Sequence, residues 1–155
     1  MTKIIYINGP SFSGKSWLNY RITEFLSHIN IHFKNVCFEQ CYKMQNPENY
    51  FYKIIEEKSD LNSVVIAESV QSNQHRKDSA IAISCFPSYE KHLDNYFACI
   101  NKFGKEYVDS RVFGYSIGKI RNAFNRDYKV INNSYTFNGK NLDDILKVVK
   151  YYAIK

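Results

Sequence analysis

The residues best suited to chemistry lie near the start of the chain. Residues 9–16 read Gly-Pro-Ser-Phe-Ser-Gly-Lys-Ser, a loop bounded by glycines that ends in a lysine and a hydroxyl. Glycines let such a loop turn so that successive backbone N–H groups point inward at phosphate oxygens. Lys15 would reach the β- and γ-phosphates of a nucleotide, and the Ser16 hydroxyl would complete the shell of a Mg²⁺ ion. The spacing therefore predicts a binding site for nucleotide phosphates.

The elements on either side of this loop make the pattern informative. Residues 4–7 form a short apolar run that is typical of a buried strand. After the loop, apolar residues recur on one helical stripe: Leu18, Ile22, Phe25, Leu26 and Ile29. A helix that begins at the loop would add the partial positive charge of its N-terminus to the phosphate site.

The rest of the chain continues to alternate apolar runs with helical patterns. Further strands are predicted at about residues 33–39, 64–67, 80–86 and 128–131. Further helices are predicted after Asn46, Ser88 and Asn141. The helix after Ser88 carries an aromatic stripe, Tyr89, Tyr96 and Phe97, which we expect to lie in the core or, alternatively, to stack on a nucleobase.

This alternation predicts an α/β fold, because parallel strands need helical connections that cover both faces of the sheet. We expect a three-layer α/β/α sandwich with a mainly parallel, five-stranded sheet. No linker divides the chain, so residues 1–155 are predicted to form a single domain.

Residues 4–18, I-I-Y-I-N-G-P-S-F-S-G-K-S-W-L, resemble the Walker A segment of P-loop NTPases, specifically of small nucleoside and nucleotide kinase-like phosphotransferases. The resemblance implies a P-loop kinase-like fold that binds ATP and Mg²⁺. It also implies a lid segment at about residues 105–126. The residues it implies for nucleotide binding are Gly9, Ser11, Ser13, Gly14, Lys15 and Ser16, and Trp17, directly after the loop, is a further candidate from its position. The aromatic ring of Trp17 would border a bound base, or would alternatively fill the edge of the core.

Two carboxylates fit the further roles that phosphorylation of a hydroxyl requires. Glu39 lies at the predicted end of the second strand, where related kinases often keep the group that accepts the proton of the acceptor hydroxyl. The alternative is a solvated loop glutamate. Glu68 follows the third strand and resembles a Walker B position, with Glu where Asp is commoner. It is the predicted metal ligand, together with Ser16.

Arginines in the predicted lid are candidates to stabilise the charge on a transferred phosphoryl group. They are Arg111, Arg121 and Arg126. The candidates for catalysis are therefore Lys15, Glu39, Arg111 and Arg121. The alternative for each arginine is a surface position that contributes only to solubility.

Composition and charge exclude several classes of protein. The chain has 155 residues, 45% of them apolar, and a formal net charge of +6, which suits a globular protein with an anionic ligand. No apolar run approaches the ~18 residues of a membrane span, so we expect a cytoplasmic protein. The four cysteines and four histidines lack metal-ligand spacing, so neither zinc nor a disulfide framework is predicted. The basic residues form no clustered stripe, which makes long nucleic acid an unlikely partner.

These features favour an ATP-dependent phosphotransferase that transfers the γ-phosphate of Mg-ATP to a small acceptor, with a nucleoside or nucleotide as first choice. A polynucleotide 5′-hydroxyl and an antibiotic-like small molecule are alternative acceptors. A nucleotide-binding module with a regulatory or scaffold role is the alternative to an enzyme. The absence of N-K-x-D and D-x-x-G motifs argues against a switch GTPase. The chain is expected to be a monomer or a homodimer, and the choice between ATP and GTP stays open.

Overall fold

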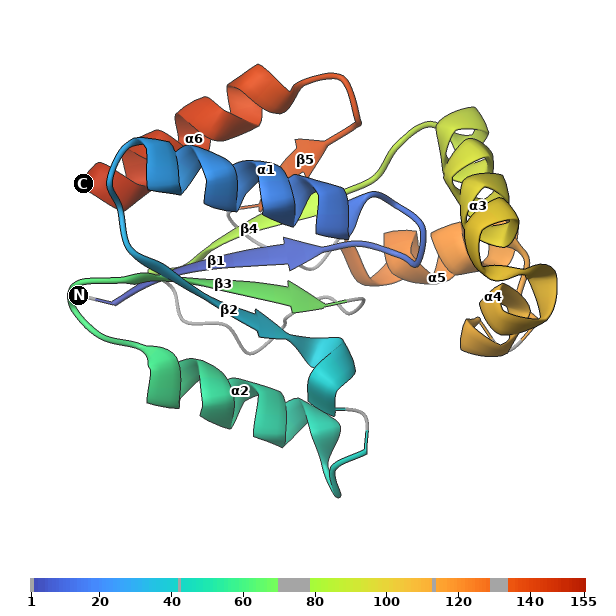
Figure 1. The fold of residues 1–155 in the computed structure, drawn as a ribbon, viewed down its shortest axis with the longest axis horizontal. Helices are drawn as coiled ribbons and strands as arrows, with labels where there is room; N and C mark the ends of the chain where they lie inside the picture. Colours follow the sequence, from blue (N-terminus) through green and yellow to red (C-terminus); the bar gives the residue numbers. More distant parts are fainter. Residues whose placement is uncertain (1, 42, 70–78, 113, 129–133) are drawn as a thin grey trace.

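The computed structural model of the chain contains one parallel sheet with helices on both faces (Figure 1). It describes residues 2–41, 43–69, 79–112, 114–128 and 134–155. The strands are β1 (Lys3–Asn8), β2 (Phe33–Cys37), β3 (Val64–Ser69), β4 (Ile81–Cys85) and β5 (Ser134–Phe137). They lie in the order β2-β3-β1-β4-β5, and each neighbouring pair is parallel. The predicted five-stranded α/β architecture is confirmed.

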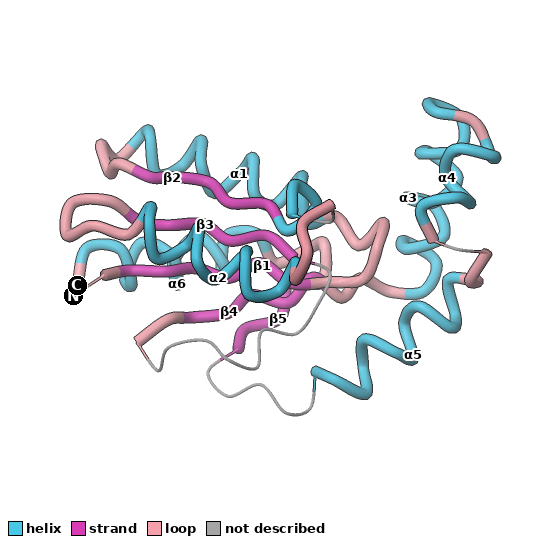
Figure 2. Tube along the Cα trace, turned by 90° about the horizontal axis from the view of Figure 1, so that it is seen from below, coloured by secondary structure: helices cyan, strands magenta, loops and turns pink. Residues whose placement is uncertain are grey.

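The helices divide into two groups by position. The helices are α1 (Lys15–His28), α2 (Pro47–Lys58), α3 (Tyr89–Phe103), α4 (Lys105–Arg111), α5 (Ile117–Tyr128) and α6 (Leu142–Ile154), with a 3-10 turn, η1 (Phe38–Cys41), after β2. In Figure 1, α1 and α6 cover one face of the sheet and α2 covers the other. The helices α3, α4 and α5 lie beyond the carboxyl ends of the strands, as Figure 2 also shows.

Two apolar cores hold the three layers together. Successive side chains of a strand point to opposite faces of the sheet. Ile5 and Ile7 of β1 therefore pack toward α1 and α6, while Ile4 and Tyr6 pack toward α2. These four residues of β1 are at most 3% exposed. This burial on both faces explains why the strand reads as a continuous apolar run in the sequence.

The aromatic stripe of α3 differs from its prediction. Tyr89 and Phe97 are 51% and 54% exposed, so the expectation that they fill the core is wrong. The main partners of α3 are α4 and α5 rather than the sheet. The stripe therefore lacks the apolar surface that a helix packed on the sheet would meet.

Two predicted strand boundaries also change. The second strand ends at Cys37, and Glu39 lies in η1. The last strand is Ser134–Phe137, which pairs with β4, and the prediction of residues 128–131 is wrong at Tyr128 because α5 ends there. Residues 129–131 lie outside the described part of the chain. The segment 105–126, which has little periodicity, contains α4 and most of α5. Within the described residues, we find no helix with the length and apolarity needed to cross a membrane.

Candidate active site

The loop of residues 9–16 lies where a parallel sheet usually binds its ligand. It follows β1, which has β3 on one side and β4 on the other. The chain goes from β1 through α1 to β2 on the far side of β3, whereas β4 and β5 extend the sheet in the opposite direction. Open α/β sheets bind ligands at the carboxyl ends of strands, where the order reverses in this way. The fold thus places the predicted phosphate loop at the expected edge.

The shape of the loop depends on its two glycines. A Cβ atom on Gly9 would lie 2.5 Å from Ser13 Oγ and 2.9 Å from the Cys85 carbonyl oxygen, so only glycine fits. Gly14 has a φ of 94°, a backbone conformation that favours glycine, and directly precedes α1. The first turn of α1 carries no acidic residue, and Gly14 has no side chain to cap it. The N–H groups at the start of α1 are therefore left for an anion.

Lys15 curls back over the loop. Its Nζ donates a hydrogen bond to the Pro10 carbonyl oxygen at 3.0 Å. Burial lowers the pKa of Lys15, and the nearby Cys85 and Glu68 oppose that shift. Ser16 lies on the exposed first turn of α1, next in the chain. The structure thus gathers Lys15 and Ser16 at the start of the same helix.

Trp17 is half exposed, with 50% of its surface accessible. Its ring stacks on Phe137 at the end of β5, with centroids 5.9 Å apart and planes 12° from parallel. The guanidinium of Arg21 lies 5.6 Å from the centre of the same ring. Because Phe137 belongs to the core that lies under α1 and α6, Trp17 packs at the edge of that core with half of its surface open. It offers an open aromatic surface beside the loop, and its contact with a bound base stays a prediction.

Glu68 is a buried carboxylate at the end of β3. It is 9% exposed and lies opposite Ile7 of β1 and Cys37 of β2 in the strand register. Its Oε2 accepts a hydrogen bond from Cys37 Sγ at 3.5 Å, whereas its Oε1 has no hydrogen-bond partner among the described residues. An unpaired buried carboxylate oxygen is costly, which makes Glu68 Oε1 a candidate to bind a cation or a hydrogen-bond donor.

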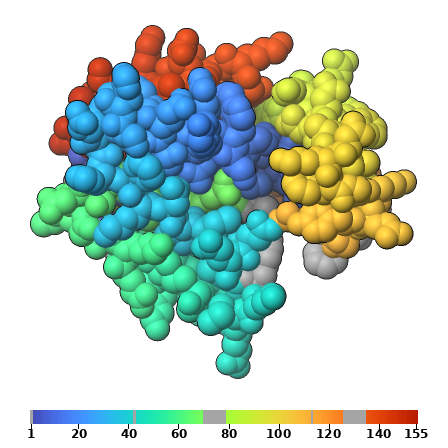
Figure 3. Space-filling model, in the orientation of Figure 1, coloured from blue at the N-terminus to red at the C-terminus, as the bar shows by residue number. Residues whose placement is uncertain are grey.

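Two of the catalytic candidates, Glu39 and Arg111, contact each other. Arg111 Nη2 of α4 forms an ion pair with Glu39 Oε1 of η1. Figure 3 shows these two segments adjoining, the cyan region of η1 against the gold helix α4. Both side chains are about half exposed, and the charge of Arg111 is close enough to lower the pKa of Lys15. The pair therefore connects the sheet to the outer helices near the phosphate loop.

Arg121 has a different environment. Its Nη1 donates to the Pro87 carbonyl oxygen at 2.7 Å and to His92 Nδ1 at 3.1 Å. Its guanidinium also lies 4.2 Å from the centre of the Phe86 ring. A contact between Arg121 and a transferred phosphoryl group stays a prediction. Arg126 belongs to α5, but its side chain lies outside the described part of the structure.

Comparison with known proteins identifies the fold. No family model and no curated protein match the chain. Three solved structures match it over nearly their whole length. A shikimate kinase from Bacteroides thetaiotaomicron is 11% identical, with a TM-score of 0.54 and coverage of 97% of this chain and 98% of that one. A sugar kinase from Janibacter sp. is 6% identical, with a TM-score of 0.56 and coverage of 98% and 94%.

The third structure is the YorR protein of Bacillus subtilis in complex with phosphorylated GDP. It is 13% identical, with a TM-score of 0.55 and coverage of 96% and 94%. The chain has a P-loop kinase-like fold. Since all three identities are low, this likeness concerns the fold. Residues 9–16 are called the P-loop below.

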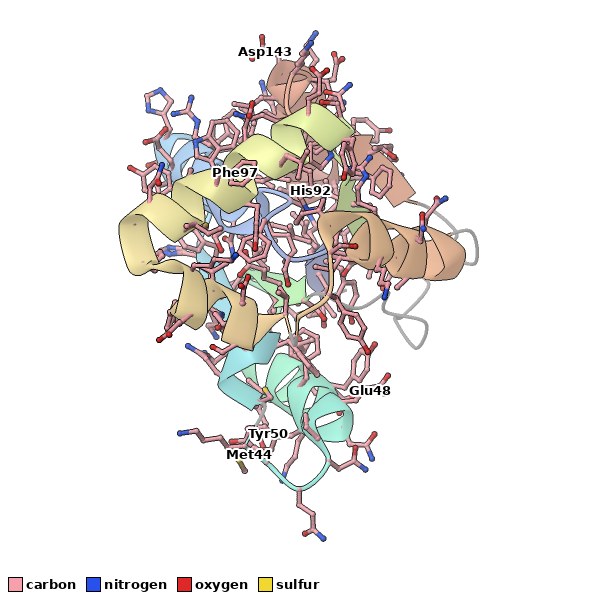
Figure 4. The ribbon with its side chains drawn as sticks, turned by 90° about the vertical axis from the view of Figure 1, so that its right-hand side faces the viewer. Met44, Glu48, Tyr50, His92, Phe97 and Asp143 are labelled. Atoms are coloured by element: carbon pink, nitrogen blue, oxygen red, sulfur yellow. The ribbon has the colours of Figure 1, made fainter. Side chains whose placement is uncertain are left out.

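Sequence reasoning missed two residues that touch the P-loop. His92 of α3 is fully buried where that helix meets α5 (Figure 4). Its Nε2 lies 2.7 Å from the Ser11 carbonyl oxygen, and Asn95 Nδ2 donates to the Phe12 carbonyl oxygen at 3.0 Å. No local pattern could have found these contacts, because they join segments far apart in the sequence.

The pairing of Glu68 with Cys37 gives a prediction for thiol reactivity. Burial, followed by the charge and hydrogen bond of Glu68, raises the pKa of Cys37 from 9.0 to about 11. At about pH 8, only about one Cys37 in a thousand is then a thiolate. In Glu68→Gln the carboxylate charge is lost, so the pKa of the Cys37 thiol falls. We expect Cys37 to be alkylated several-fold faster, as measured by mass spectrometry of the Cys37 peptide.

The control for this experiment is Glu56→Gln, which changes an exposed glutamate of α2. Its Cys37 alkylation rate should equal that of the wild-type protein. An unchanged rate in Glu68→Gln would show that burial alone sets the reactivity of Cys37.

Proposed function

We propose that the chain is an ATP-dependent phosphotransferase that transfers the γ-phosphate of Mg-ATP to a small acceptor, with a nucleoside or nucleotide as first choice. The observation that carries the proposal is the arrangement of the P-loop. Its lysine and the uncapped start of α1 lie near the buried carboxylate of Glu68, one oxygen of which has no hydrogen-bond partner among the described residues. This combination suits a phosphate chain and the cation that accompanies it.

The donor site follows from these positions. The N–H groups of the P-loop and α1 would hold the phosphates, and Lys15 would leave the Pro10 carbonyl to reach them. Ser16 and Glu68 are the residues that would hold Mg²⁺. Mg²⁺ usually binds one or two carboxylates together with substrate phosphates, so a single buried glutamate fits it. When bound, the ion would neutralise charge on the β- and γ-phosphates.

The acceptor site would lie beside the Glu39–Arg111 pair. The Glu39 carboxylate would accept the proton of an acceptor hydroxyl, and Arg111 would face a negatively charged part of the acceptor or of the transferred group. The two side chains neutralise each other in the free protein. An acceptor would therefore either hydrogen-bond to both members of the ion pair or break the pair when it binds. A polar acceptor that carries both a hydroxyl and an anionic group fits these requirements.

The test is a measurement of acceptor-dependent ADP release from Mg-ATP. The panel contains nucleosides, nucleoside monophosphates, 5′-hydroxyl oligonucleotides and small hydroxylated metabolites, with and without a phosphate or carboxylate. Release that depends on one acceptor class and on Mg²⁺ would support the proposal and name the substrate. Tight nucleotide binding with no release on any acceptor would contradict it and favour the nucleotide-binding module. Repeating the panel with GTP would decide the donor.

A further inference from the structure

Helix α3 holds the tip of the P-loop through backbone carbonyl oxygens. His92 Nε2 meets the oxygen of Ser11, and Asn95 Nδ2 meets that of Phe12. The Phe12 ring also makes an edge contact with Tyr96, with centroids 5.3 Å apart. Phe12 has a φ of 66°, a left-handed conformation that non-glycine residues adopt only where their surroundings hold them. The contacts from α3 supply that restraint.

The hydrogen bonds of His92 define the position of its proton. Arg121 Nη1 approaches Nδ1 at 3.1 Å, and a guanidinium can only donate hydrogen bonds. Nδ1 must therefore accept, which leaves the single proton of a neutral imidazole on Nε2. That N–H then donates to the Ser11 carbonyl oxygen. An imidazolium would carry a second N–H at Nδ1, directed at the N–H of Arg121.

The surroundings of His92 favour this neutral form. Its side chain is fully buried, Arg121 faces it from α5, and the charge of Lys15 acts on it from α1. Burial lowers the pKa of His92, and both positive charges lower it further, against the opposing effect of the Ser11 carbonyl. His92 therefore stays neutral to a lower pH than an ordinary histidine does.

We propose that His92 is a positioning residue of the P-loop, which fixes the loop in its phosphate-binding shape through the hydrogen bond from Nε2 to Ser11, while Arg121 selects the tautomer that makes this bond. The inference rests on the proposed function in one respect, that the P-loop binds a nucleotide. It assigns Arg121 the role of fixing the tautomer of His92 before any ligand binds. It also links the outer helices α3 and α5 to the nucleotide site.

Two substitutions of His92 separate positioning from general structural support. In His92→Gln, the amide nitrogen reaches about as far as Nε2 and restores a donor for Ser11. In His92→Asn, the shorter amide reaches only about as far as Nδ1, so the Ser11 oxygen loses its donor. Both variants replace the ring with a neutral amide. A merely structural role would therefore make them lose nucleotide affinity equally.

We expect His92→Asn to bind Mg-ATP about tenfold more weakly than the wild-type protein, because a buried carbonyl loses its hydrogen bond. His92→Gln should bind Mg-ATP with an affinity within about threefold of that of the wild-type protein.

Calorimetric measurement of Mg-ATP affinity at about pH 8 and about pH 5 gives a second readout. Wild type should lose more affinity than His92→Gln at the lower pH, since only wild type has an imidazole to protonate. ATP itself also titrates in this range, but its titration affects both proteins equally and cancels in the ratio of their affinities.

The control is His28→Gln, which changes an exposed histidine at the far end of α1. It should follow wild type at both pH values. Equal affinity losses in His92→Gln and His92→Asn, or a ratio of wild type to His92→Gln that does not change with pH, would overturn the inference.

Two further measurements keep the inference testable. If wild type binds no nucleotide, the proposed function fails, and hydrogen exchange of the free protein decides the inference. His92→Asn, but not His92→Gln, should then lose amide protection in residues 9–17, and equal loss in the two variants would overturn the inference.

If His92→Asn does not fold, Arg121→Met replaces it as the test variant. Without the charge of Arg121 the pKa of His92 rises, so the acid loss of affinity should begin at higher pH, and an unshifted profile would overturn the inference.

Discussion

Replacing Lys15 by alanine should lower the rate of phosphoryl transfer by about 10²- to 10³-fold or more. Its Nζ is the cation of the P-loop itself, and it lies over the loop, 3.0 Å from the Pro10 carbonyl oxygen. The N–H groups of the loop and of α1 remain in the variant, so nucleotide affinity should fall less than the rate. Turnover at saturating Mg-ATP, measured as ADP release with the best acceptor, gives the rate.

The control for Lys15→Ala is Lys150→Ala, which removes an exposed positive charge on α6. It should keep the wild-type rate, since α6 lies on a face of the sheet away from the carboxyl edge (Figure 1). Substantial turnover in Lys15→Ala would contradict the proposed function. It would mean that another group neutralises the transferred phosphate.

Replacing Glu39 by glutamine should lower kcat by about 10²- to 10⁴-fold and leave the affinity for Mg-ATP nearly unchanged. Glutamine has nearly the same shape as glutamate but cannot accept a proton at neutral pH. Glu39 lies in η1 and forms an ion pair with Arg111, so it belongs to the proposed acceptor site and is not part of the loop that would hold the nucleotide. Steady-state kinetics with both substrates varied, together with calorimetric ATP binding, separates the two effects.

Two variants control the Glu39 experiment. Glu48→Gln changes an exposed glutamate in the first turn of α2 and should behave as wild type. Arg111→Gln breaks the same ion pair but keeps the carboxylate, so it separates the loss of the ion pair from the loss of the carboxylate. If Glu39→Gln keeps the wild-type kcat, the role of Glu39 is confined to holding Arg111, and the acceptor proton leaves by another path.

Much of the candidate site could be predicted because its signals are local. The strand, the P-loop and the helix follow one another within residues 3–28, and the alternation of apolar runs with helical patterns predicted the α/β sheet. Glu68 directly follows the predicted apolar run 64–67 and lies near the carboxyl end of β3, so its place at that edge of the sheet followed from the same alternation. These features depend on the period of apolar residues and on glycine geometry, which neighbouring residues determine.

The sequence by itself therefore determined the sheet, the P-loop and the edge at which a ligand would bind. Only the tertiary structure decided what surrounds that loop: the ion pair of Glu39 with Arg111, the burial of His92 against Ser11, and the exposure of the aromatic stripe on α3. Each depends on how α3, α4 and α5 pack beyond the sheet. Side chains distant in sequence meet there, and no local periodicity records such a meeting because it arises from packing rather than from the propensity of either segment.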